Sequence, residues 1–133
     1  MNKLIRILFF VLIVSLFASC EKNPGEGGNA TIIGSVWVKD YNTTFTELIG
    51  EYAAMQEDVF IVYGDNVGFD DKTETDYLGN YRFEYLRPGK YSVFVYSKDS
   101  TLETVNGEIA IIKEIEITDA SQELSVPQIT IFN

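Results

Sequence analysis

Residues 75–93, TDYLGNYRFEYLRPGKYSV, hold the clearest structural pattern in the chain. Tyr81, Phe83 and Tyr85 stand at alternate positions, and the residues between them are charged. An apolar residue at every second position is typical of a β-strand that buries one face. The Pro-Gly pair at 88–89 favours a tight turn, and the alternation resumes directly after it. This stretch therefore predicts a β-hairpin with Tyr81, Phe83 and Tyr85 on one face, of which Tyr81 and Phe83 point into the core, while Leu86 closes its end.

Further runs with the same alternation lie on both sides of this hairpin. They cover residues 32–38, 59–63, 109–117 and 124–131, while residues 91–95 form the second strand of the hairpin itself. We expect a bulge at Lys113, which breaks a row of isoleucines, and an edge strand at Pro127, which lacks an amide donor. About seven short strands with regular turns predict an all-β fold, a sandwich of two antiparallel sheets.

Residues 46–56 fit the strand pattern less well. Leu48, Tyr52 and Met55 follow the spacing of a helix. Gly50 interrupts that spacing and disfavours a helix by about 1 kcal/mol relative to alanine. We therefore expect a loop with one helical turn in this part of the chain.

The central stretch resembles the signature of carboxypeptidase regulatory-like domains and their Cna-B relatives. That signature reads T-D-x-x-G-x-Y-x-F-x-x-L-x-P-G-x-Y-x-V, and residues 75–93 fill every specified position. The run Ile32-x-Gly34-x-Val36 is similar to the opening strand of the same family. The resemblance implies a single prealbumin-like, Ig-like Greek-key β-sandwich of about seven strands over residues 30–133. Family members serve as stalks, spacers, adhesin modules and accessory domains, so the resemblance implies a scaffold and not an activity.

The first twenty residues have the layout of a secretory signal peptide. Lys3 and Arg6 give a positive start, an apolar run follows, and small residues precede Cys20, the only cysteine. The apolar run is shorter than the roughly 18 residues expected of a membrane-spanning helix. Residues 17–20, FASC, resemble a bacterial lipobox, in which the cysteine receives lipid and becomes the mature N-terminus. An ordinary signal peptide that leaves a free thiol on Cys20 is the alternative.

This resemblance implies three segments. Residues 1–19 are a lipoprotein signal peptide, residues 20–29 are the lipidated Cys20 and a flexible glycine-rich linker, and residues 30–133 are the folded domain. It also implies a lipid anchor in the outer membrane of a Gram-negative bacterium. The domain then lies either on the cell surface or on the periplasmic side, and the sequence leaves both alternatives open. Cleavage leaves 114 residues with a net charge of −12 and no second cysteine, so packing alone must stabilise the domain.

Charge and residue content restrict the function. The chain has 133 residues and a net charge of −10, and an acidic surface repels phosphate backbones, which disfavours nucleic-acid binding. The chain has no histidine, which removes Ser-His-Asp and Cys-His catalysis and the histidine-dependent enzymes on related folds. No spacing singles out a pair of catalytic carboxylates. We therefore expect no catalytic residue, no enzyme activity and no cofactor besides the lipid on Cys20.

Five acidic residues gather near the middle of the chain and form a weak candidate for calcium. They are Asp65, Asp70, Asp71, Glu74 and Asp76. Oxygen-rich loops bind calcium, but this spacing matches no D-x-D-x-D-G loop with a terminal bidentate glutamate. We therefore favour a solvated acidic loop and predict no metal site.

Four aromatic residues fall on the strand phase opposite the predicted core. They are Trp37, Phe60, Phe94 and Tyr96. Exposed rings of this kind contact protein partners or stack on sugar rings. Alternatively, the segment 41–57 covers them, or they are single exposed rings without a role.

Two functions from different classes follow. The first is a non-catalytic, membrane-anchored lipoprotein whose β-sandwich makes protein–protein or structural contacts at the cell envelope. The second is a carbohydrate-binding accessory lipoprotein of a surface glycan-uptake or adhesion system. In both, the expected partners are the membrane, through the lipid, and other envelope proteins or glycans.

Overall fold

The computed structural model describes residues 2–3 and 23–133. The predicted signal peptide, apart from residues 2–3, and the lipidation candidate Cys20 lie outside the described residues. Residues 23–133 form an all-β domain without a helix. Within the described residues, no helix has the length and apolar character needed to cross a membrane. The strands are β1 (Glu26–Tyr41), β2 (Leu48–Ala53), β3 (Asp58–Tyr63), β4 (Asp71–Glu74), β5 (Asn80–Leu86), β6 (Gly89–Lys98), β7 (Glu108–Ile117), β8 (Glu123–Ser125) and β9 (Ile129–Phe132).

Strand β1 forms the centre of the first sheet. It is 16 residues long and carries two short strands on each side. On one side β5 pairs with its first half and β2 with its second half, both antiparallel. On the other side β8 and β9 pair with the same two halves in parallel, separated at Pro127 as expected for an edge strand. The expectation of two antiparallel sheets is therefore wrong for this sheet, which is mixed.

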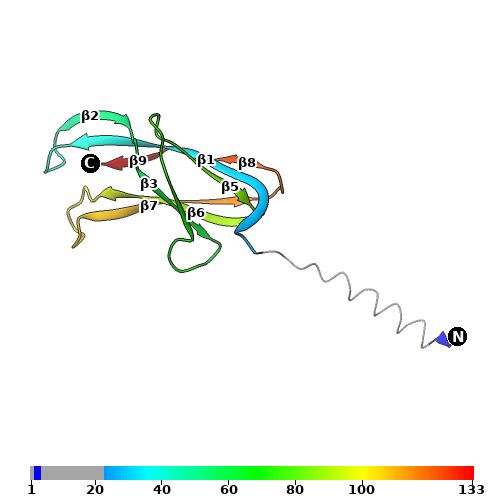
Figure 1. Cartoon of the computed structure of the whole chain (residues 1–133). Coiled ribbons are helices and arrows are strands. Elements are labelled where there is room, and N and C mark those ends of the chain that lie inside the picture. Colours follow the sequence, from blue (N-terminus) through cyan, green and yellow to red (C-terminus); the bar gives the residue numbers. More distant parts are fainter. Residues whose placement is uncertain (1, 4–22) are drawn as a thin grey trace.

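The second sheet has the order β4-β3-β6-β7 and is antiparallel throughout. Figure 1 shows β6 and β7 in a layer that packs against the layer of β1, β8 and β9. The β6–β7 register runs without a shift from Gly89↔Ile117 to Lys98↔Glu108, so the bulge that we expected at Lys113 is absent. Lys113 is half-buried on an edge strand, where a lysine stem can follow the apolar face while its amine reaches water.

The core lies between the two sheets, on the faces that the alternation predicted. Tyr81 and Phe83 from β5 and Tyr91 from β6 are all buried. Gly34 on β1 lies beneath the Tyr81 ring, because a Cβ at this position would stand 2.3 Å from the Tyr81 hydroxyl oxygen. The glycine is thus required by the close approach of a core tyrosine. The remaining core side chains include Ile32, Val36, Val59, Ile61, Leu86, Val93, Val95, Ile117 and Ile129.

Tyr85 departs from the alternation that placed it on one face with Tyr81 and Phe83. Its side chain is 69% exposed and its φ is +59°, a left-handed conformation. Leu86 is buried in its place and pairs with both Glu26 and Ala30 of β1, where the register is irregular. The period-two pattern therefore ends before Tyr85, so the expectation that Tyr85 shares a face with Tyr81 and Phe83 is wrong, while the inward position expected for Leu86 is confirmed.

Two strands have no clear sequence signal. Strand β2 lies within the region 46–56, so the loop with one helical turn that we expected there is wrong. Leu48 and Tyr52 are exposed, so their helix-like spacing does not mark a buried face. Strand β4 is the other strand that the sequence did not predict. It lies among the acidic residues of the calcium candidate and pairs with β3. Both short strands are stabilised by pairing with a longer neighbour, which side-chain patterns alone do not reveal.

The folded part begins earlier than Ala30, where we expected it. Strand β1 begins at Glu26, and Gly25 before it is buried. The Arg87 amide donates to the Gly25 carbonyl at 2.8 Å, and the Gly25 amide donates to the Tyr91 hydroxyl at 2.8 Å. These bonds use backbone atoms of a glycine-rich stretch, so hydrophobic periodicity could not have indicated them. The segment expected as a flexible linker over residues 20–29 is therefore part of the fold from Asn23 onward.

Candidate functional site

Three of the four predicted contact residues lie together on the outer face of the second sheet. Phe60 of β3 and Phe94 of β6 are direct cross-strand partners, with ring centroids 5.0 Å apart and an angle of 14° between the rings. Tyr96 stands edge-on to both rings, at 5.6 Å from Phe60 and 5.5 Å from Phe94. Phe69 adds a fourth ring at 4.9 Å from Phe60. Aromatic groups at these separations attract one another beyond their area burial.

The cluster continues across the sheet and reaches solvent. Ile112 of β7 is the cross-strand partner of Phe94, on the side away from Phe60. Phe69, Tyr96 and Ile112 are 53%, 46% and 56% exposed, while Phe60 and Phe94 are half-buried between them. We call these five residues the aromatic surface. Adjacent exposed apolar side chains of this kind mark interaction sites more often than scattered ones do.

One edge of the aromatic surface carries charge. Lys72 of β4 is the cross-strand partner of Phe60, and its Nζ lies 3.0 Å from Oδ2 of Asp58. Both side chains are substantially exposed. An exposed ion pair of this kind contributes little stability, so both groups are available to a ligand. The arrangement places polar groups beside apolar rings, which suits either a protein partner or a sugar.

Trp37 does not join this cluster. It lies on β1 in the first sheet, where its cross-strand partners are Ala53 and Thr130, and it is half-buried. The strand phase was therefore a correct guide to outward orientation, but it could not show which sheet each strand enters. The predicted contact group of Trp37, Phe60, Phe94 and Tyr96 is thus split between the two outer faces of the sandwich.

Sequence reasoning missed two members of the aromatic surface. Phe69 lies in the β3–β4 loop, where no periodicity applies, and only its packing on Phe60 brings it to the sheet. Ile112 had a usable signal, because it is the one large apolar residue on a phase of the 109–117 run that otherwise holds Ala110, Glu114 and Glu116. The segment 41–57, considered as a cover for the aromatic residues, pairs instead with β1 through β2.

A second group of rings lies at the end of the sandwich that holds the C-terminus. Phe132 stands 5.5 Å from Tyr41 and 6.3 Å from Phe45, and all three side chains are half-buried. Phe45 adopts a φ of +54° in the loop between β1 and β2. The rings pack this loop against β9, so we interpret the group as part of the structure of that end.

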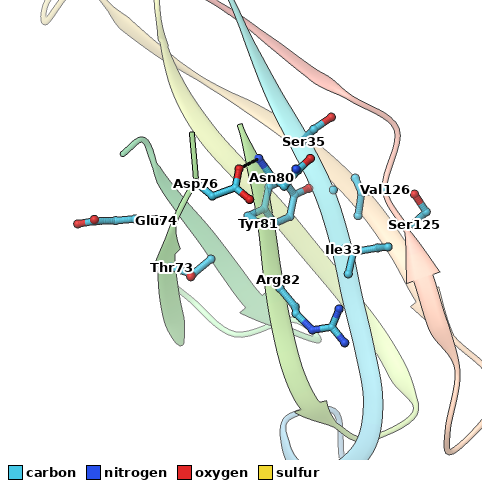
Figure 2. A pocket seen from close by; sticks show the side chains of 11 residues that line it. Ile33, Ser35, Thr73, Glu74, Asp76, Asn80, Tyr81, Arg82, Ser125 and Val126 are labelled. Atoms are coloured by element: carbon cyan, nitrogen blue, oxygen red, sulfur yellow. Dashed lines mark hydrogen bonds between the residues drawn. The ribbon is translucent and has the colours of Figure 1, made fainter. Parts of the chain in front are cut away.

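A polar hollow of about 560 Å³ lies over β1 and β5, near the junction of β8 and β9 (Figure 2). Its wall includes Ser35, Asp76, Asn80, Arg82 and Ser125. Figure 2 shows the Glu74 side chain extending away from the other labelled residues. The hollow extends from the outside of the first sheet to Thr73 and Glu74 of β4 in the second sheet, and its polar groups do not converge on one point.

Most charged groups of this hollow already have partners. Asp76 Oδ1 accepts hydrogen bonds from the amides of Leu78 and Asn80, both at 2.9 Å, and the bond from Asn80 is the main cause that lowers its pKa. Arg82 donates through Nε to Glu84 and through a terminal nitrogen to Glu123. These bonds hold the β4–β5 turn and the outer surface of the sheet. They leave no free acid–base pair within the hollow.

Tyr81 is the unusual residue of the hollow. Its side chain is only 3% exposed, and its hydroxyl has no hydrogen-bond partner among the described residues. Burial raises the pKa of Tyr81 above its ordinary value. The hydroxyl is therefore protonated at neutral pH and is not suited to act as a base.

The five acidic residues of the calcium candidate do not form a cluster. Asp70 Oδ2 accepts the Tyr63 amide at 2.7 Å and Oδ1 accepts Asn66 Nδ2 at 3.0 Å. Asp71 and Glu74 are the first and last residues of β4, so the expectation of one acidic loop is wrong for them. Within the described residues, no group of three His, Cys, Asp or Glu side chains is placed to hold a metal ion.

Comparison with known proteins supports the fold. No protein-family model and no curated protein matches this sequence. Among solved structures, the chain is similar to "a putative carbohydrate binding protein" from Pseudomonas aeruginosa, with a TM-score of 0.50 and 12% identity over 80% of this chain and 90% of that chain. It also aligns with an (S)-allantoin synthase, with a TM-score of 0.44 and 11% identity over 81% of this chain and 43% of that one. The two packed sheets define a β-sandwich domain, and the likeness to the Pseudomonas aeruginosa structure supports this fold without a family assignment.

Proposed function

We propose that this chain is a non-catalytic, lipid-anchored envelope lipoprotein whose β-sandwich binds a partner through the aromatic surface. The observation that carries the proposal is the row of apolar side chains across the second sheet, where Phe60, Phe94 and Ile112 are successive cross-strand partners and Ile112 is exposed. Exposed apolar groups on a small acidic domain reduce solubility unless a partner covers them. The signal-peptide layout and the lipobox-like FASC ending at Cys20 support anchoring in the outer membrane of a Gram-negative cell.

The first partner class that we propose is another protein of the envelope. Aromatic residues are enriched at the centres of protein interfaces, and Phe60 and Phe94 are already ordered by mutual stacking. A rigid surface loses less side-chain entropy on binding. The absence of histidine and the engaged charges of the polar hollow support a binding role over an enzymatic one.

The test uses the full lipoprotein purified from membranes with its bound neighbours. Phe94→Ala combined with Tyr96→Ala should remove the captured partner, because these residues form the centre and the exposed edge of the aromatic surface. Trp37→Ala is the matched control, an aromatic truncation on the opposite outer face, and should leave capture unchanged. Equal capture by all variants would contradict the proposed surface.

A glycan is the second candidate, supported by the likeness to the structure from Pseudomonas aeruginosa and by the exposed Tyr96 ring. Aromatic rings stack on the apolar faces of sugars, and the Lys72–Asp58 pair beside Phe60 offers polar contacts. Affinity electrophoresis in gels that contain envelope polysaccharides separates the two candidates. Retardation that disappears in Tyr96→Ala and persists in Trp37→Ala supports a glycan ligand, and no retardation favours a protein.

Lipidation has its own test. Mass spectrometry of the membrane-extracted protein should find a diacylglyceryl group on Cys20 and no residue before it. Cys20→Ala should remain unprocessed and lose the lipid. A free thiol on Cys20 in the mature protein would overturn the anchoring part of the proposal while leaving the binding surface to be tested separately.

A further inference from the structure

The first described residues are held tightly against one end of the sandwich. The Arg87 side chain donates from Nε to the Asn23 carbonyl at 2.9 Å. Gly25 exchanges backbone bonds with this region, accepting from the Arg87 amide and donating to the Tyr91 hydroxyl, both at 2.8 Å. The Tyr91 hydroxyl in turn donates to the Arg87 carbonyl at 2.6 Å. Tyr91 is buried, so this network is fixed to the core.

Pro24 completes the attachment. A Cβ on Gly89, the first residue of β6, would lie 2.6 Å from Pro24 Cγ, and the φ of Gly89 is +145°. A Cβ on Gly64, which follows β3, would lie 3.5 Å from the same Cγ of Pro24. The proline ring thus packs against the start of β6 and the end of β3, and glycine stands at both points of contact. The chain therefore enters the sandwich in one defined position.

This position lies at one pole of an elongated domain. Figure 1 shows the start of β1 and the C-terminus at opposite ends of the sandwich. The pole around Gly25 contains the turn at 87–88, the loop 64–70 and the loop 118–122, since Gly89 pairs with Ile117. The other pole contains the loops 42–47 and 99–107. The ten residues of β6 span about 30 Å between these poles.

We propose that the docked segment Asn23–Gly25 sets the orientation of the domain on the bilayer, with the Gly25 pole toward the lipid headgroups. This inference rests on the proposed lipidation of Cys20. Only three peptide steps separate Cys20 from Asn23, and they span at most about 11 Å. The carbonyl of Asn23 is already bound to Arg87, so the anchor cannot let the domain reach far from the headgroups or turn over.

The orientation also fixes the height of the aromatic surface. Phe94 lies five residues along β6 from Gly89, about 16 Å from the Gly25 pole. The surface is therefore held within about 30 Å of the headgroups once the short tether is included. A partner bound there must itself be a membrane component or reach close to the bilayer.

The experiment uses intrinsic tryptophan fluorescence, because the chain has a single tryptophan and keeps its thiol for the lipid. In a Trp37→Phe background, Asp119→Trp reports on the Gly25 pole and Val105→Trp reports on the far pole; both positions are exposed. The lipoprotein is reconstituted in phosphatidylethanolamine–phosphatidylglycerol vesicles that carry a nitroxide on a fraction of the headgroups. The reporter at 119 should be quenched at least about twofold more strongly than the reporter at 105, because about 30 Å separates the poles.

A linker insertion is the matched control, since it leaves every domain residue intact. Ten Gly/Ser residues between Lys22 and Asn23 lengthen the tether to a root-mean-square reach of about 20 Å and should remove the difference between the two reporters. Arg87→Ala with Tyr91→Phe, checked by thermal melting for retained folding, should reduce the difference, because it removes the side-chain bond to the Asn23 carbonyl and the hydroxyl bond to the Gly25 amide.

The outcomes separate this inference from the proposed function. Equal quenching at both poles, or stronger quenching at 105, overturns the orientation even when mass spectrometry confirms the lipid. If the Cys20 thiol of the native protein carries no lipid, the anchoring proposal fails. The orientation is then tested on the chain from Cys20 onward, joined to a maleimide lipid through that thiol. Unequal quenching in that conjugate supports the inference, and equal quenching overturns it.

Discussion

The two outer faces of the sandwich are built from strands of the same alternating pattern, but they carry different chemistry. On the first sheet, Arg82 pairs with Glu84 and Glu123, and Lys39 lies 3.5 Å from Glu51. On the second sheet, the corresponding outward positions hold the stacked rings of Phe60 and Phe94. Water solvates the first face well, whereas the second gains free energy when a ligand covers it. The difference supports the proposal that the second face is the one that binds, although both faces share one core.

The largest effects should come from the shared core and should be equal for the two sheets. Ile32 on β1 and Ile61 on β3 are both fully buried. Replacing either by alanine removes buried methylenes and leaves a cavity, which costs about 2–5 kcal/mol. Urea unfolding monitored by circular dichroism measures the loss. Two separate unfolding transitions in either variant would mean that the two sheets unfold separately.

The next effect should appear only on the aromatic face. The stacked pair Phe60 and Phe94 should show a coupling of about 0.5–1.5 kcal/mol in a double-mutant cycle to alanine, because each ring loses its partner in either single variant. The cycle is measured from urea-unfolding free energies. Additive single-variant losses would show that the rings are adjacent without stabilising one another.

Alkaline pH should also act on the second sheet. Burial, with help from the charge of Glu26, raises the pKa of Tyr63 to about 12, against about 10 in an unfolded chain. A folded-state pKa above the unfolded value gives stability that is complete below pH 10 and is lost as the pH rises toward 12. Tyr63→Phe should make the fall in melting temperature over this window shallower, although Tyr81 and Tyr91 shift in the same direction. The exposed Tyr77→Phe is the control and should follow the parent protein.

The smallest effect should come from the charged face. Arg82→Ala breaks contacts to Glu84 and Glu123 that lie in solvent, where salt and water screen the attraction. We expect almost no change in melting temperature and no change in capture of the partner. A large loss of stability would show that the ion pairs on this face do more than keep it soluble.

Much of the architecture could be predicted from local sequence patterns. The alternation at 59–63, 80–86 and 109–117 identified β3, β5 and β7, because one residue in two must face the core. The Pro-Gly pair at 88–89 marked the turn between β5 and β6. The all-β sandwich is confirmed by the two packed sheets.

The missed elements share one physical cause. Strands β2 and β4 are exposed and gain their structure from pairing with β1 and β3. The attachment of Gly25 depends on bonds from its backbone to the Arg87 amide and the Tyr91 hydroxyl, which lie more than sixty residues away in the sequence. Bonds between distant backbone atoms leave no periodic trace in the side chains.

The amino-acid sequence by itself determined which side chains point inward and outward, because strand geometry alternates them by stereochemistry alone. It also determined the acidic charge and the absence of histidine, which restrict the chemistry. Only the tertiary structure decided that Phe60, Phe94 and Tyr96 share a face while Trp37 lies on the other. The reason is that sheet membership depends on long-range pairing, and a strand with the same alternation fits the edge or centre of either sheet.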